Sequence, residues 1–198
     1  FNVAVGQNYF MEMAKMRAYR VLWANIAKAF GAKEENAKML IHAFNAQINM
    51  SLYDSYVNML RTTTGSMSAI LGGVHSFSVT PFDMVYEAST EFAERIARNQ
   101  QLILKEESHF DKVADPAAGS YYIENLTDSL VKAAWALFLQ IQEEGGYLAA
   151  LRNGTIQKMV KESATKRLNN VATRREIILG TNQYPNFNEV ADAAVAVE

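Results

Sequence analysis

The chain has 198 residues, of which 49% are hydrophobic and 20% charged, a composition typical of a folded globular domain. Nineteen Lys and Arg stand against 21 Asp and Glu without a dense basic cluster, which argues against a nucleic-acid partner. There is no Cys, so disulfides, thiolate metal sites and a Cys nucleophile are excluded, and the longest apolar stretch is far shorter than the roughly 20 residues of a membrane span. We therefore expect a cytoplasmic protein with no membrane partner.

Four units, each a strand followed by a helix, come one after another along the chain. Apolar runs predict parallel strands near residues 1–5, 38–45, 74–79 and 113–123. Helical periodicity predicts helices at about 8–30, 51–72, 90–107 and 125–144, the second of them starting at a weak capping box of Ser51 and Asp54. In the last of these helices a stripe is expected to face the sheet, namely Leu126, Leu130, Ala133, Leu137 and Ile141. This alternation is typical of a parallel sheet with helical crossovers, and four units are half of a TIM barrel. The predicted fold class is α/β, a half TIM barrel followed by linker helices.

The first helix is apolar on two sides. One stripe, with Phe10, Met13 and Ala14, has the spacing of a face packed on a sheet. The second stripe should meet neighbouring helices or a partner, and on an isolated chain it should stay exposed or drive self-association unless the linker helices cover it. It consists of Met16, Tyr19, Trp23, Ile26 and Phe30.

The sequence after Gly145-Gly146 changes character. Helices are expected at 147–152 and at 155 to about 170, followed by a less regular tail that ends in Asp192–Ala196. We predict two parts, a barrel half at 1–146 and a helical linker at 147–198. Because the first residue is Phe1 and not Met, we expect the chain to be cut from a longer polypeptide.

In a barrel, functional side chains lie where strands end, so four polar stretches are candidates for the site. None contains a recognised catalytic device. The three His are separated by whole secondary elements and have no carboxylates at the spacing of metal ligands, so no metal site is expected. The candidate stretches are Gln7–Asn8, Asn45–Asn49, His75–Thr80 and Asp115–Tyr121.

Several segments resemble the methylmalonyl-CoA mutase family, in order and at its spacing. They cover about residues 1–184, and an ordered series of this kind is far more specific than any one motif. The segments are Ala4–Ala18, Leu22–Ala24, Arg61-Thr62, Leu71–Gly73, Arg95–Asn99 and Ala114–Tyr121 continuing to Leu126-Thr127.

The resemblance implies the second half of the barrel in which that family encloses an acyl-CoA substrate against adenosylcobalamin. It also implies a linker that leads to a separate cobalamin-binding domain. The chain lacks Asp-x-His-x-x-Gly, the cobalt-ligating motif of the family, so we expect it to bind no cobalamin by itself.

The chain departs from the family where catalytic members hold their ligands. Those members carry Gln-Thr-Ser-Gly-Trp at the positions of 44–48 here, and Thr-Gln-Ser-Leu-His-Thr-Asn at 74–80. Apolar groups in place of hydrogen-bond donors should cost orders of magnitude in rate and discrimination. The degenerate substrate- or cofactor-facing positions are Phe44, Asn45, Gln47, Ile48, His75, Ser78, Asp115 and Ser120.

A barrel that keeps its architecture and loses its site resembles the small, non-catalytic subunit of two-subunit mutases, which pairs with a catalytic large subunit. Two alternatives stay open. One is a catalytic acyl-CoA mutase of altered substrate preference that uses His75 and Asn45 as new polar contacts. The other is an unrelated interaction domain.

Overall fold

Three short parallel strands form the centre of the computed structural model, which describes residues 1–189. Strands β1 (Asn2–Val5), β2 (His42–Asn45) and β3 (Ser76–Ser78) lie side by side in chain order. Their register places Ala4, Phe44 and Ser78 in one row across the sheet. The first three predicted strands are confirmed.

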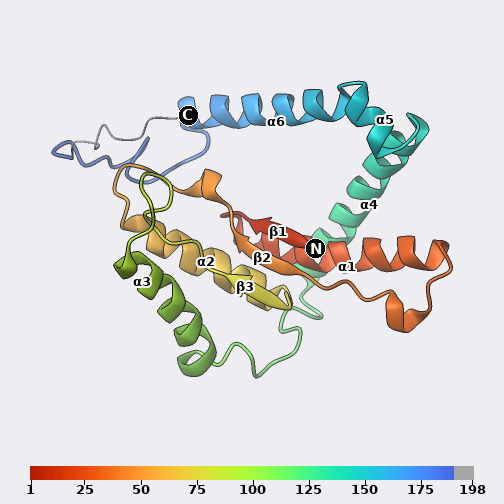
Figure 1. Cartoon of the computed structure of the whole chain (residues 1–198), viewed down its shortest axis with the longest axis horizontal. Coiled ribbons are helices and arrows are strands. Elements are labelled where there is room, and N and C mark those ends of the chain that lie inside the picture. Colours follow the sequence, from red (N-terminus) through yellow and green to blue (C-terminus); the bar gives the residue numbers. More distant parts are fainter. Residues whose placement is uncertain (190–198) are drawn as a thin grey trace.

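Six α-helices accompany these strands in the part of the chain that the structure describes (Figure 1). Two begin at side-chain caps: Asn8 Oδ1 accepts from the Met11 amide at 3.4 Å, and Thr90 Oγ1 accepts from the Ala93 amide at 3.2 Å. None of the helices in residues 1–189 is long and apolar enough to cross a membrane. The helices are α1 (Tyr9–Ala29), α2 (Val57–Leu71), α3 (Glu91–Leu102), α4 (Tyr121–Glu143), α5 (Tyr147–Arg152) and α6 (Thr155–Ala172). Two short 3₁₀ segments are η1 (Glu34–Asn36) and η2 (Gln47–Asn49), and the π-helical η3 (Ile103–Glu107) continues α3.

Helices α1 and α2 cover one face of the sheet and close the main core there. Val5, Ile41 and Ala43 point from the strands and the segment before β2 toward Met16 of α1 and Ala69 of α2. Met16 is 0% exposed, so it lies at the centre of this cluster. Side chains on successive strand residues alternate between faces, which is why every second residue of β1 and β2 joins the core.

The opposite face of the sheet is open in residues 1–189. His42 is half-buried on this face, and its Nδ1 lies 2.8 Å from Ser76 Oγ and its Nε2 3.4 Å from Ser78 Oγ. The other residues on this face are exposed, namely Asn2, Ala4, Phe44, Ser76 and Ser78. The sheet is therefore packed on one side only.

The structure reverses our assignment of the two stripes of α1. Tyr19 and Trp23 of the second stripe pack with Met16 against the sheet, whereas Met13 of the first stripe packs against Ala117 and Ile123 near the start of α4. Phe30, at the end of the second stripe, is 88% exposed. The core on the sheet thus shields Met16, Tyr19 and Trp23, so the expected exposure of the second stripe is wrong for these residues, while self-association stays a prediction.

The predicted fourth strand is wrong. Residues 111–120 form turns, and α4 begins at Tyr121, inside the predicted strand. Asp115 and Gly119 have φ values of 46° and 77°, in the left-handed region that extended strands do not use. Pro116 also lacks the N–H that a central strand needs. The backbone turns here because Ala118 donates to the Asp115 carbonyl at 3.0 Å.

The start predicted for the second helix is also wrong. We expected a capping box at Ser51 and Asp54, but α2 begins at Val57. Asp54 has a φ of 50°, which a helix does not tolerate, and the backbone N–H and C=O of Ser51 are both bound by the side chain of Asn58. The polar residues before α2 therefore form a tied loop instead of a first helical turn.

Helices α4 and α5 lead away from the sheet, and α6 runs back, so that Arg167 near its end contacts Asn49 after β2 (Figure 1). Helix α4 packs on α1 and not on the sheet, and its buried residues, Ile123 and Thr127, lie near its start. The predicted sheet-facing stripe of α4 is therefore wrong. That stripe was Leu126, Leu130, Ala133, Leu137 and Ile141.

The two helices expected after residue 146 are confirmed as α5 and α6. The division into parts at 1–146 and 147–198 stays a prediction. The segment Asp192–Ala196 lies outside the described residues.

The burial of Met16 generates a stability prediction. Met16→Ala should lower the free energy of unfolding by about 2–5 kcal/mol, because it removes a fully buried side chain and leaves a cavity. Phe30→Ala, at the exposed residue that follows the same helix, serves as the control and should change stability by less than about 0.5 kcal/mol. Urea unfolding measures both, and equal losses would contradict the reversed assignment of the stripes.

Candidate functional site

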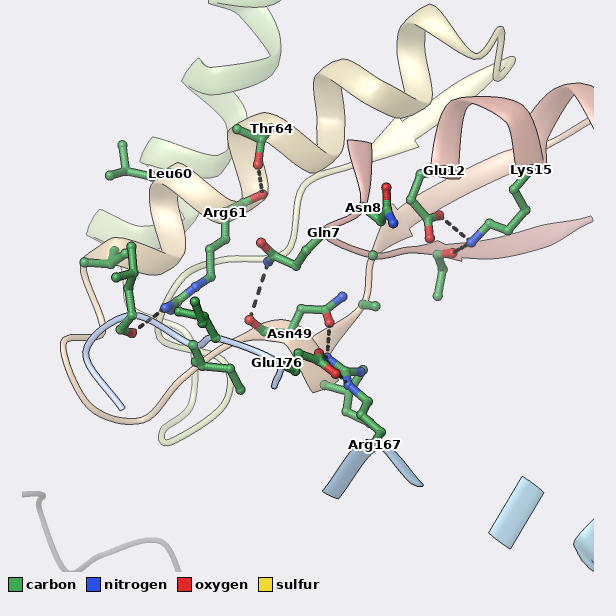
Figure 2. A pocket seen from close by; sticks show the side chains of 18 residues that line it. Gln7, Asn8, Glu12, Lys15, Asn49, Leu60, Arg61, Thr64, Arg167 and Glu176 are labelled. Carbon is green, nitrogen blue, oxygen red and sulfur yellow. Dashed lines mark hydrogen bonds and ion pairs between the residues drawn. The ribbon is translucent and has the colours of Figure 1, made fainter. Parts of the chain in front are cut away.

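A cavity of about 880 Å³ lies at the carboxyl ends of β1 and β2 (Figure 2). Ligands in parallel α/β folds bind at this edge, because the loops that follow the strands meet there. The segments after both strands line it together with α2 and a segment that follows α6. The lining residues are Ala4, Gly6, Gln7, Asn8, Glu12, Lys15, Ala46, Ile48, Asn49, Val57, Leu60, Arg61, Thr64, Arg167 and Glu176–Leu179.

Arg61 of α2 is the central cation of this cavity. Its guanidinium donates to Ser51 Oγ at 2.6 Å, to Asn58 Oδ1 at 2.7 Å and to the Leu179 carbonyl at 2.6 Å. Partial burial lowers the pKa of Arg61, and the nearby Asp54 carboxylate opposes that shift. Arginine still carries its charge at neutral pH. The group therefore ties α2 to the loop before it and to the segment after α6.

Asn58 holds the same loop from inside. It is fully buried and uses both ends of its amide: Oδ1 accepts from the Ser51 amide at 3.0 Å, and Nδ2 donates to the carbonyls of Ser51 at 2.9 Å and Phe82 at 3.1 Å. Every buried polar atom of this side chain is thus satisfied, as burial requires.

The remaining charged side chains of the cavity are also paired. Lys15 forms an ion pair with Glu12 and donates to the Ala4 carbonyl at 2.8 Å. Arg167 of α6 donates to Asn49 Oδ1 at 2.5 Å and pairs with Glu176 at 3.0 Å (Figure 2). Because each cation is already engaged, the lining offers polar surface but no free charge for an anionic ligand.

The cavity holds no recognisable catalytic device. No His lines it, and its two carboxylates are ion-paired. Across residues 1–189, no group of three His, Asp or Glu side chains lies together in a way that could hold a metal ion. The arrangement can hold a ligand against its polar walls, but the side chains that could carry acid–base chemistry, Glu12, Lys15 and Glu176, are engaged in ion pairs.

Two of the four predicted stretches converge on the cavity. Gln7 and Asn8 follow β1, and Gln7 Nε2 donates to the Asn49 carbonyl at 3.5 Å. Ile48 lines the cavity after β2. Gln47 is next to it in sequence but is not part of the lining, and its amide lies 3.5 Å from Met84 Sδ.

Asn45 is a structural residue and not a ligand-facing one. It is 4% exposed, its Nδ2 donates to the Thr62 carbonyl at 3.2 Å, and its Oδ1 accepts from the Thr80 amide at 3.2 Å. The side chain therefore joins the end of β2 to α2 and to the segment after β3. Gly65 of α2 leaves the room for it, since a Cβ there would lie 2.9 Å from Asn45 Nδ2.

His75 lies at the wrong end of the sheet for the cavity. It precedes β3, at the amino end of that strand, and its Nδ1 accepts from the Ile41 amide at 3.2 Å. Phe44 and Ser78 lie on the open face of the sheet instead. None of these three residues lines the cavity, so the structure does not bring them to one site with Ile48.

Asp115 and Ser120 lie near the contact between α1 and the start of α4. Arg17 of α1 binds the Asp115 carboxylate and donates to Glu124 Oε1 at 2.6 Å. Burial lowers the pKa of Arg17 while its contacts with Asp115 and Glu124 raise it, with a raised pKa as the result. Ser120 precedes α4 without a side-chain capping bond. Asp115 therefore ties the segment before α4 to α1, Ser120 makes no such contact, and neither residue lines the cavity.

Sequence reasoning missed Arg61, Asn58, Arg167 and Glu176 as residues of this region. Arg61 stood in one of the segments that resemble a known family, which was a usable signal. Arg167 contacts both Glu176 and Asn49. These contacts depend on how the segment after α6 returns to the strand ends. No local sequence pattern predicts such a long-range contact.

The bond from Arg61 to Leu179 generates a second prediction. Arg61→Met keeps most of the side-chain length and removes the donors, so the amides of residues 176–183 should exchange hydrogen about tenfold faster or more. Arg152→Met, at an exposed end of α5, is the matched control. Hydrogen exchange read by mass spectrometry measures both variants, and unchanged exchange in Arg61→Met would show that Arg61 does not hold this segment.

Comparison with known proteins gives a consistent result. The family model for methylmalonyl-CoA mutase matches residues 1–197. The chain is 56% identical over 193 residues to the methylmalonyl-CoA mutase small subunit of Porphyromonas gingivalis, covering 96% of this chain and 31% of that protein. It is 41% identical to the small subunit from Streptomyces virginiae, with 96% and 30% covered, and 40% identical to the methylmalonyl-CoA mutase of Rhizobium meliloti, with 96% and 27% covered. The chain thus spans under a third of the length of these relatives.

Proposed function

We propose that this chain, which belongs to the methylmalonyl-CoA mutase family, is part of a small subunit of that enzyme. In this role it supports a catalytic large subunit that isomerises methylmalonyl-CoA and succinyl-CoA, and it performs no chemistry itself. The observation that carries the proposal concerns Asn45, a polar residue at a predicted ligand position. Its side chain is buried, and its hydrogen bonds join β2 to α2 and to the segment after β3.

The names of the relatives support the same role. Two of the compared relatives, from Porphyromonas gingivalis and Streptomyces virginiae, are named small subunits. We further propose that the sheet with α1 and α2 is part of a TIM-barrel half whose open face is covered in the full-length protein. On that proposal, α5 and α6 begin a linker, the partner chain forms a heterodimer with this one, and the complex is cytoplasmic.

Adenosylcobalamin would act in the full complex, where it supplies the radical that rearranges the carbon skeleton. The described residues of this chain do not fit a cobalt-binding role. His75 Nδ1 is engaged by a backbone amide, His42 lies between two serine hydroxyls, and His109 is exposed in a loop. None of the three lines the strand-end cavity. We therefore assign no step of the reaction to this chain.

The competing proposal is a catalytic mutase with a different substrate preference. The 40% identity to the Rhizobium meliloti protein, which is named methylmalonyl-CoA mutase without a subunit designation, favours it. The geometry does not, because the two polar groups it would use lie apart. Asn45 is buried at the carboxyl end of β2, and His75 is at the amino end of β3.

Co-purification tests the main proposal. The full-length polypeptide that contains this chain should co-purify with a methylmalonyl-CoA mutase large subunit, and mutase activity should require the large subunit. The small subunit alone should show no turnover. Turnover by that polypeptide without a partner would contradict the proposal.

Calorimetry separates the two proposals at the level of ligand binding. The chain should bind neither adenosylcobalamin nor methylmalonyl-CoA with micromolar affinity. His75→Asn tests the catalytic alternative most cleanly, because Asn Oδ1 can still accept from the Ile41 amide while the imidazole Nε2 is removed. Micromolar binding of the CoA ester that is lost in His75→Asn would support the catalytic alternative.

A further inference from the structure

Helix α6 is held poorly by the rest of the described chain. It has 18 residues and none of them is buried. Val160 and Leu168, on one side of it, are 63% and 70% exposed. An isolated helix of this length is marginal in water, and helices in proteins gain most of their stability by packing a face. We therefore expect a further contact to stabilise α6.

One face of α6 is cationic. Lys158, Lys161, Thr165 and Asn169 follow one another at intervals of three or four residues, which places them on one face of the helix. Together with Lys166, Asn170 and the following Arg175, they surround a hollow of about 670 Å³. We name Lys158, Lys161, Lys166 and Arg175 the α6 cationic face.

Positive charge on this face is largely uncompensated. Glu162 is the one carboxylate that lines the hollow, against four cations. Within residues 1–189 none of these four cations forms an ion pair, whereas Arg167 on the same helix is paired with Glu176. The excess is local, because the chain as a whole has a formal net charge of -2.

An acidic protein surface is the partner that fits these features best. The hydroxyl of Thr165 and the amides of Asn169 and Asn170 add donors suited to carboxylate side chains. No aromatic residue lines the hollow, so the stacking that single-stranded nucleic acid uses is missing from it. A concave surface also suits protruding acidic side chains better than a flat bilayer.

We propose that the α6 cationic face is a docking surface for an acidic surface of the partner large subunit. This inference rests on the pairing put forward above and adds to it where the contact lies and what chemistry it uses. Exposed ion pairs are individually weak and screened by salt. A contact made by several of them should therefore act mainly on the rate and the salt dependence of association.

The test compares two lysine triples in the full-length polypeptide that contains this chain. The test variant carries Lys158→Gln, Lys161→Gln and Lys166→Gln. The control carries Lys28→Gln, Lys33→Gln and Lys38→Gln, which removes the same charge from exposed lysines near the end of α1 and in the segment before β2. Glutamine has nearly the helix propensity of lysine, so both variants should fold. Circular dichroism is used to check that they do. Binding to a large subunit is measured at about 50 mM and about 300 mM NaCl.

We expect the test variant to bind the large subunit about tenfold more weakly than wild type at low salt, and with a smaller salt dependence. The control should bind within about twofold of wild type. Equal affinities of the test variant and wild type would overturn the inference and leave the pairing intact. Failure of wild type to bind at either salt concentration would refute the pairing, and the inference with it. The inference would also be overturned if the test variant lost binding to phosphatidylserine vesicles while it still bound the large subunit normally.

Discussion

The packing of Met16 against the sheet is the contact on which the rest of the structure depends. It fixes α1 on the same face as α2, because Ala69 of α2 belongs to the same buried cluster. With both helices on that face, the segments that follow β1 and β2 are brought together at one edge of the sheet. The strand-end cavity exists because of this one-sided arrangement, and so does the open face on the other side.

Polar side chains at the strand ends serve the architecture. Asn45 and Asn58 spend their amides on backbone groups, and Arg61 and Arg167 hold loops from two different parts of the chain. A ligand that drew on the guanidinium of Arg61 or Arg167 would have to replace its present bonds with equally good ones, since an unpaired buried polar group is costly. The strand ends thus keep the shape of a binding site, while their hydrogen-bonding groups stabilise the fold.

Sequence reasoning found what short-range patterns encode. Three strands and five helices were placed well because apolar runs and helical spacing are local properties. The fourth strand failed because the left-handed φ of Asp115, a non-glycine residue, is not visible in its residue type. The stripes of α1 were exchanged because both are apolar, so composition could not say which one meets the sheet. Ile48 was located by the rule that sites follow strand ends, but the burial of Asn45 depends on α2, which is distant in sequence.

The close approach of Gly65 to Asn45 has a consequence for how this chain can change over time. A side chain at position 65 would overlap the amide at position 45, so each residue restricts what the other can become. A substitution at 65 would push the Asn45 amide off its bond to the Thr62 carbonyl, whereas a smaller residue at 45 would make room for it but leave the Thr80 amide without its acceptor. The two positions are therefore expected to drift as a linked pair, with the order of substitutions constrained, in any lineage that keeps this packing.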